Sequence, residues 1–97
     1  MQLFHATDLT GVQGIRADGF RISHVGDSAG CAWFADSPEG ASTGSAAREW
    51  LVIVDLADAQ AHEYLYRFED GEPYLGNFCI PFEVVNAASP FRFVKVP

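Results

Sequence analysis

Residues 50–56, Trp50-Leu51-Val52-Ile53-Val54-Asp55-Leu56, form the stretch of sequence that decides the fold. The run is apolar except for its aspartate and is rich in β-branched residues, which predicts a strand buried on both faces. The chain has 97 residues and is 48% hydrophobic, so it can bury a core around this strand as one domain covering residues 1–97. Only 20% of the residues are charged, which excludes intrinsic disorder.

Shorter apolar or alternating stretches on both sides of this run predict further strands. They cover residues 3–7, 20–23, 31–35, 62–68, 78–81 and 91–96. The cluster Glu-Asp-Gly-Glu-Pro at 69–73 is typical of a turn between strands. Pro81 has no amide hydrogen to give to a ladder, so we expect its strand to lie at an edge or to end there.

Two segments carry signals that start a helix. Thr10-x-x-Gln13 matches the capping-box pattern, and Gly19 can supply the left-handed cap that ends this helix. Ser37 followed by Pro38 predicts an N-cap and the first helical residue. The small residues at 40–47 are compatible with a frayed helix or an ordered loop, and 57–61 with a turn or one helical turn. The order of strand, helix and then mostly strands predicts an α+β domain.

The charge balance is acidic. Six Lys and Arg against thirteen Asp and Glu leave a formal net charge of −7, so extended nucleic-acid binding is disfavoured, although a local pocket could still hold a nucleotide. Acidic residues crowd the third quarter of the chain, where we expect a solvated acidic hairpin, with an acidic partner site as the alternative. They are Asp58, Glu63, Glu69, Asp70 and Glu72.

Cysteine and histidine usage predicts neither a disulfide scaffold nor a metal site. Cys31 and Cys79 are flanked by apolar residues, so we expect buried thiols and a reducing, cytoplasmic setting. His5, His24 and His62 are scattered without metal-ligand spacing. No apolar run approaches the length of a membrane span, and the first residues lack the pattern of a secretory signal.

Four motifs follow one another along the chain. They are Leu-Phe-His-Ala-Thr at 3–7, Gly-Ile-Arg-Ala-Asp-Gly-Phe-Arg-Ile at 14–22, Cys-Ala-Trp-Phe-Ala-Asp at 31–36, and Asn-Phe-Cys-Ile-Pro at 77–81 with Val-Val-Asn at 84–86. In this order they resemble the first strand, the helix exit, the Gly-Ile-Tyr-Phe-Ala-Asp strand and the Glu-Tyr-Val-Ile-Pro…Val-x-Asn strand of the ADP-ribosyltransferase superfamily, in its His–Tyr–Glu branch. The resemblance implies split antiparallel or mixed sheets with one or two short helices.

The same resemblance implies that NAD⁺ is bound, as a substrate, with no metal. His5 would donate a hydrogen bond to a ribose hydroxyl. The backbone of Ala6 would hold the nicotinamide carboxamide, with Thr7 in support. Trp33, with Phe34 beside it, would supply the ring face on which nicotinamide stacks. We therefore expect the imidazole and the indole to flank one dinucleotide-sized cleft.

The chain departs from the pattern of the family at three positions. Asn77 stands where the catalytic glutamate is expected; its amide can bond a ribose hydroxyl but cannot stabilise a cation by charge or act as a base. Glu72 or Glu69, on the preceding turn, could reach the site instead. Ala6 replaces a glycine, and the place of a second aromatic residue falls near Gly44.

Three functions follow, in decreasing order of preference. The first is an enzyme that transfers a single ADP-ribose unit or hydrolyses NAD⁺. The second is a catalytically inactive module of the same fold that binds a nucleotide or a protein, and the third is an RNA 2′-phosphotransferase, which the acidic charge disfavours. Without the resemblance, His5 is most simply a hydrogen-bonded structural histidine. A homodimer could form through edge strands near Pro81 and residues 91–93.

Overall fold

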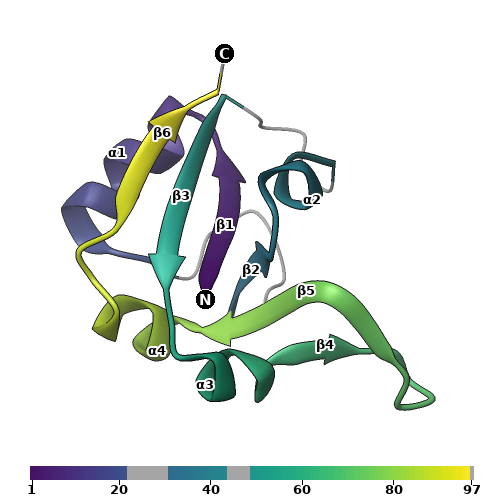
Figure 1. Ribbon diagram of the computed structural model, residues 1–97. Helices are drawn as coiled ribbons and strands as arrows, with labels where there is room; N and C mark the ends of the chain where they lie inside the picture. Colours follow the sequence, from purple (N-terminus) through teal and green to yellow (C-terminus); the bar gives the residue numbers. More distant parts are fainter. Residues whose placement is uncertain (22–30, 44–48, 97) are drawn as a thin grey trace.

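The computed structural model describes residues 1–21, 31–43 and 49–96. Within these ranges the chain forms six strands and four short helices, which confirms the α+β class (Figure 1). The strands are β1 Gln2–Thr7, β2 Cys31–Ala35, β3 Trp50–Asp55, β4 Leu65–Arg67, β5 Pro73–Pro81 and β6 Arg92–Lys95. The helices are α1 Leu9–Asp18, α2 Pro38–Thr43, α3 Asp58–His62 and α4 Phe82–Ala87.

All six strands belong to one antiparallel sheet, in the order β4-β5-β2-β1-β3-β6. Of the two pairings expected, antiparallel or mixed, the structure has the antiparallel one, but in one sheet instead of split sheets; the expectation of only one or two helices is wrong. The sheet is nevertheless narrow at one place. β1 pairs with β3 from Gln2 to Thr7, whereas β1 and β2 share the single register pair Phe4 and Ala35. The two halves of the sheet thus join at one point and separate beyond it.

The core lies on one face of this sheet. Leu3, Val52 and Phe78, from three different strands, have no more than 2% of their surface exposed, and α1, α3 and α4 cover them. Leu51 and Ile53 point to the other face of β3 and are buried as well. The prediction that the stretch 50–56 is buried on both faces is confirmed.

Helix α1 begins two residues earlier than the capping box predicted. The carboxylate of Asp8, and not Thr10, caps it, accepting a hydrogen bond from the Gly11 amide at 2.8 Å. The helix ends as expected at Gly19, whose φ of 74° is open to glycine and whose amide bonds the Ile15 carbonyl at 2.8 Å. At α2 the predicted start is confirmed: the Ser37 hydroxyl accepts from the Gly40 amide at 3.0 Å.

The segment after β5 differs from the prediction. Pro81 ends its strand, as one of the two expectations had it, and residues 82–87, where no helix was predicted, form helix α4 with Val85 fully buried. β5 is not an edge strand, since it lies between β4 and β2. Of the strand expected at 20–23, Phe20 and Arg21 lie outside any strand, and 22–23 lie outside the described residues, as do the expected loop at 24–30 and Gly44.

β4 and β5 form a hairpin that runs across the direction of β1 and β3 and extends beyond the rest of the molecule (Figure 1). β4 is shorter than the predicted 62–68, and β5 starts earlier than the predicted 78. Gly76, with φ 84°, lies where β5 bends, and its carbonyl accepts from the Asp36 amide at 3.1 Å. No helix in the described ranges is long and apolar enough to cross a membrane.

Cys31 and Cys79 form a disulfide, with their Cα atoms 5.5 Å apart. The expectation of two buried free thiols is therefore wrong. The reason is the register of β2 with β5: Cys79 lies opposite Trp33, so Cys31, two residues away, shares its face. A persistent disulfide is typical of oxidising surroundings, which does not fit the expected reducing, cytoplasmic setting.

Candidate functional site

A pocket of about 260 Å³ lies where β1 and β2 separate, under the start of α2. Its lining comes from four elements that are distant in the sequence: β1, β2, α2 and β5. The residues are Phe4, His5, Ala6, Trp33, Phe34, Ala35, Gly40, Ala41 and Asn77. Five of the seven predicted site residues are among them: His5, Ala6, Trp33, Phe34 and Asn77.

His5 is the one titratable side chain among these nine residues. Its Nδ1 lies 2.8 Å from the Trp33 carbonyl oxygen, and its ring packs against Phe20, edge to face, and against Phe34, with centroids 5.2 and 5.5 Å away. Removal from water lowers the pKa of His5 below its ordinary value of 6.5, and the bond to the Trp33 carbonyl opposes this only in part. The imidazole is therefore neutral near pH 7.

This arrangement fixes the tautomer of the imidazole. A carbonyl oxygen can only accept, so Nδ1 carries the hydrogen and donates to Trp33, and Nε2 keeps its lone pair. At Nε2, His5 can therefore only accept a hydrogen bond, whereas the resemblance implied a donor.

Trp33 points away from the core. Its neighbour Phe34 is buried, and because side chains alternate along a strand, the Trp33 indole lies on the opposite face, 43% exposed. There it contacts Tyr66 edge to face, with ring centroids 4.9 Å apart. His5 packs on the core side with Phe34. The imidazole and the indole thus do not flank a dinucleotide-sized cleft as expected; what joins them is the Trp33 carbonyl.

Asn77 lies opposite Ala35 in the β2–β5 register, at the end of the pocket nearest the β5 bend. Its side chain is half-buried, and its Nδ2 donates a long hydrogen bond, 3.4 Å, to the Leu75 carbonyl. Within the described part of the chain, the Asn77 side-chain oxygen accepts no hydrogen bond. Asn77 therefore offers the pocket a neutral amide and no charge.

The structure places two predicted residues elsewhere. The Thr7 side chain lies against Gly11 at the start of α1, where its hydroxyl fills the space that a Cβ would take. Glu72 lies in the exposed turn between β4 and β5; its amide bonds the Asp70 carboxylate at 3.0 Å and its carbonyl accepts from the Phe68 amide at 2.9 Å. Neither residue lines the pocket.

Four lining residues were not predicted: Phe4, Ala35, Gly40 and Ala41. The signal for the last two was present in the small residues of the segment 40–47. A Cβ on Gly40 would lie 3.2 Å from that of Ala35, so a small residue here lets α2 approach β2 closely.

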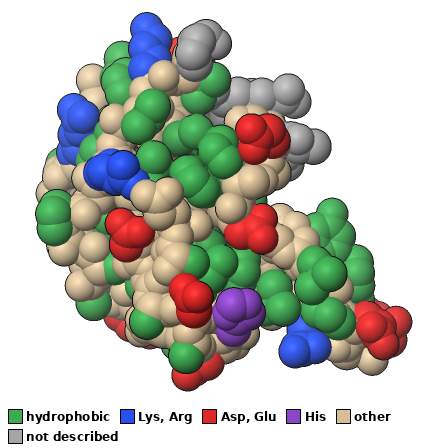
Figure 2. All heavy atoms as spheres, in the orientation of Figure 1, with side chains coloured by type: hydrophobic (Ala, Val, Ile, Leu, Met, Phe, Trp, Pro, Cys, Tyr) green, Lys and Arg blue, Asp and Glu red, His purple; other side chains and the backbone are tan. Residues whose placement is uncertain are grey.

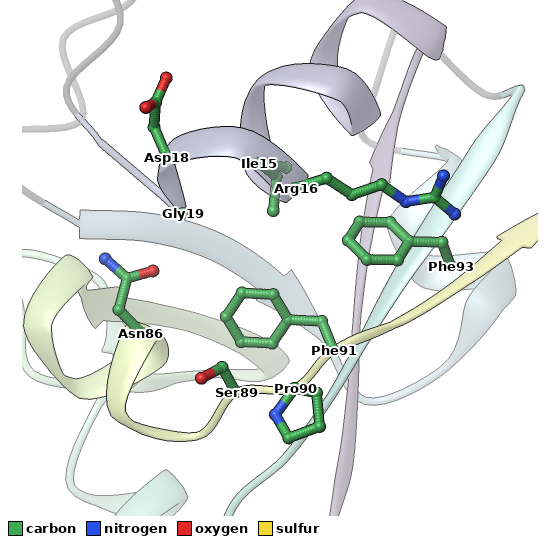
Figure 3. Close-up of a pocket in the computed structure, with 9 residues that line it drawn as sticks. All are labelled: Ile15, Arg16, Asp18, Gly19, Asn86, Ser89, Pro90, Phe91 and Phe93. Carbon is green, nitrogen blue, oxygen red and sulfur yellow. The ribbon is translucent and has the colours of Figure 1, made fainter.

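A second pocket, of about 430 Å³, lies between the end of α1 and the start of β6 (Figure 3). Two of its polar side chains, Asn86 and Arg16, already have partners inside the protein. Asn86 clamps the backbone of Phe20, accepting from its amide at 2.8 Å and donating to its carbonyl at 2.9 Å. The Arg16 guanidinium reaches over the Phe93 ring, 4.6 Å from its centroid. These contacts hold the fold together, so the smaller pocket is the better candidate site.

The donor set of the candidate site does not suit a metal. In the described ranges no group of three or more His, Cys, Asp or Glu side chains gathers that could hold an ion. Comparison with protein-family models, with curated proteins and with solved structures found no significant match. The site must therefore be interpreted from its own chemistry.

Proposed function

We propose that this protein is a small ADP-ribosyltransferase-like domain that binds NAD⁺, or a related nucleotide with a nicotinamide ring, in the pocket between β1, β2, α2 and β5. One observation carries the proposal. Residues of three separate sequence motifs (His5 and Ala6, Trp33 and Phe34, and Asn77) line a single pocket. The sheet order brings them together, because β2 lies between β1 and β5 and the pocket forms where β1 and β2 separate.

The size and lining of the pocket favour a planar ring, either neutral or positively charged, over a whole dinucleotide. At about 260 Å³ it is below the roughly 300–1,000 Å³ of sites that enclose drug-sized ligands. The nicotinamide end would enter it and the adenosine end would lie outside. An aromatic residue at the rim, Trp33, attracts the positive ring of oxidised nicotinamide through its π-face. The Ala6 backbone and the Asn77 amide are the candidates for the carboxamide and for a ribose hydroxyl.

The electrostatics of the pocket favour binding over turnover. Loss of nicotinamide builds positive charge on the ribose, and enzymes stabilise such charge with a preorganised anion or dipole. None of the nine lining residues is a carboxylate, and Asn77 occupies the place where the resemblance expects one. We therefore favour a nicotinamide-nucleotide binding module.

Transfer of a single ADP-ribose unit, or hydrolysis of NAD⁺, is the second candidate. The observation that favours it is the neutral His5, whose Nε2 keeps a lone pair that can accept a hydrogen bond from a hydroxyl. A ribose bound there would lie on the core side of the sheet, on the face opposite the Trp33 indole. An RNA 2′-phosphotransferase is less favoured, because the nine lining residues in the described part of the chain include no arginine or lysine to hold a phosphate.

Isothermal titration with nicotinamide, NAD⁺, NADH and ADP-ribose tests the proposal. We expect NAD⁺ to bind about fivefold more tightly than NADH, because only the oxidised ring is cationic, and ADP-ribose to bind weakly. Trp33→Ala should lower NAD⁺ affinity about five- to tenfold. Tyr74→Ala is the matched control, since Tyr74 is an exposed aromatic residue outside the pocket.

A nicotinamide-release assay separates the two candidates. The binding module should release none, and Asn77→Glu should raise release by placing a carboxylate at the pocket. Release by the unchanged protein that disappears in His5→Ala would instead establish the enzyme. Equal affinity for ADP-ribose and NAD⁺, unaffected by Trp33→Ala, would refute nicotinamide binding in this pocket.

A further inference from the structure

Four aromatic side chains form a continuous exposed row that begins on β2 and continues along the β4–β5 hairpin. They are Trp33, Tyr66, Phe68 and Tyr74, hereafter the aromatic row, and each has between 39% and 47% of its surface exposed. Trp33 contacts Tyr66 at 4.9 Å, Tyr66 contacts Tyr74 at 6.2 Å, and Tyr74 contacts Phe68 at 5.1 Å between ring centroids. Exposed apolar residues usually lie singly, so a connected group of four points to an interaction surface.

The aromatic row has no part in the core. None of its residues belongs to the buried cluster or packs against it, and Leu75, beside Tyr74 in β5, is 77% exposed. The ring contacts are all edge to face, with interplanar angles between 68° and 72°. Such contacts leave ring faces uncovered, where a cation or another apolar group can lie.

The charges around the aromatic row are mostly negative. Glu69, Asp70 and Glu72, all exposed, lie at the turn of the hairpin, and Figure 2 shows hydrophobic side chains on the protruding hairpin with acidic ones at its tip. The one basic residue of the hairpin, Arg67, is held by the turn, donating to the Gly71 carbonyl at 3.0 Å. A partner here meets aromatic faces bordered by carboxylates.

This combination of charge and aromaticity decides among the possible occupants. A second copy of the chain would bring another net charge of −7 to the same surface, and a nucleic acid would bring phosphates, so both are repelled. Lysine and arginine side chains are attracted by the carboxylates and by the ring faces together. Arginine is especially suited, because its planar guanidinium stacks on aromatic rings.

We infer that the aromatic row binds an arginine- and lysine-rich segment of a partner protein. The inference does not rest on the proposed function, because the row needs no nucleotide. The two surfaces do meet at Trp33, which lines the pocket and starts the row. A segment bound along the row therefore reaches the mouth of the pocket.

Fluorescence anisotropy with a labelled, unstructured peptide of alternating arginine and leucine tests the inference without NAD⁺. We expect saturable binding that weakens as salt is raised, and none to the analogue in which glutamate replaces arginine. Tyr66→Ser and Phe68→Ser should each weaken binding about tenfold, as truncation of an interface anchor does. Val94→Ser, at a side chain 45% exposed on the far edge strand β6, is the matched control.

A second variant keeps the test valid if the aromatic variants fail to fold. The triple change Glu69→Gln, Asp70→Asn and Glu72→Gln alters only exposed side chains and should weaken binding and flatten its salt dependence. The inference would be overturned if Val94→Ser lost as much peptide affinity as the aromatic variants, or if the glutamate peptide bound as tightly as the arginine peptide. It would also be overturned if the protein preferred single-stranded RNA, or if it formed a dimer that buries the aromatic row. Since no nucleotide is present, these outcomes are independent of the NAD⁺ titration.

Discussion

Loss of the Cys31–Cys79 disulfide should destabilise this protein more than any surface change. The bond joins β2 to β5 across 48 residues of sequence. A cross-link stabilises mainly by restricting the unfolded chain, and a loop of this length corresponds to about 4 kcal/mol in the free energy of unfolding. Because domains of this size have about 5–15 kcal/mol in total, the loss is a large share of the whole.

Urea denaturation, followed by tryptophan fluorescence, measures this effect. The double variant Cys31→Ser with Cys79→Ser should unfold at much lower urea, and its Tm should fall by roughly 20 °C. Reductant should move the unchanged protein to the same midpoint and leave the double variant unaffected, which is the internal control. Refutation would come from a reductant-insensitive midpoint in the unchanged protein, since the cysteines would then be unbonded in solution and the register of β2 with β5 in doubt.

Three further predictions concern the fold and the pH dependence. Asn86→Ala should lower the free energy of unfolding by about 2 kcal/mol in urea titrations, because it leaves both backbone groups of Phe20 without partners; a loss below about 0.5 kcal/mol would mean that water replaces the clamp. Gly14→Ala should raise the free energy of unfolding by about 0.5–1 kcal/mol, since a Cβ at this position in α1 meets nothing within 4 Å. Gly11→Ala should lower the free energy of unfolding, because its Cβ would meet a side chain of β1. The opposite order in calorimetry would contradict the packing of α1. Because the pKa of His5 is lowered in the folded protein, the unfolded chain takes up a proton as the pH falls through about 6.5 while the folded chain does not. The free energy of unfolding should therefore fall below that pH, by at most about 1.4 kcal/mol per pH unit. His5→Gln should flatten this dependence of stability on pH.

The parts of the fold that sequence predicted well have a strong local signal. The buried run at 50–56 and the strands at 3–7 and 31–35 depend on apolar patterning, and the cap at Ser37 on the proline that follows it. Each of these segments adopts the structure that its own residues favour. Local and global preferences agree there.

The parts that were missed depend on contacts between distant segments. No helix was predicted at 82–87; burial of Val85 and the Asn86 clamp on Phe20 stabilise helix α4 there. Nothing in the spacing of Cys31 and Cys79 indicates a bond; only the sheet register brings them together.

The candidate site was predicted in part for the same reason. The convergence of β1, β2 and β5 followed from the resemblance, since no periodicity could bring Asn77 beside Trp33. The face on which each side chain lies, and therefore the separation of the His5 imidazole from the Trp33 indole, depends on strand register. Register is set by the pairing of the whole sheet, so the motifs alone could not predict it.

The most direct test of nicotinamide binding is an amide chemical-shift titration of the ¹⁵N-labelled protein with nicotinamide and with NAD⁺. The account predicts shared, saturable shifts at Ala6, Trp33 and Asn77, which line the small pocket. Shifts confined to Gly19 and Asn86, in the larger pocket, or no shifts at all, would contradict it.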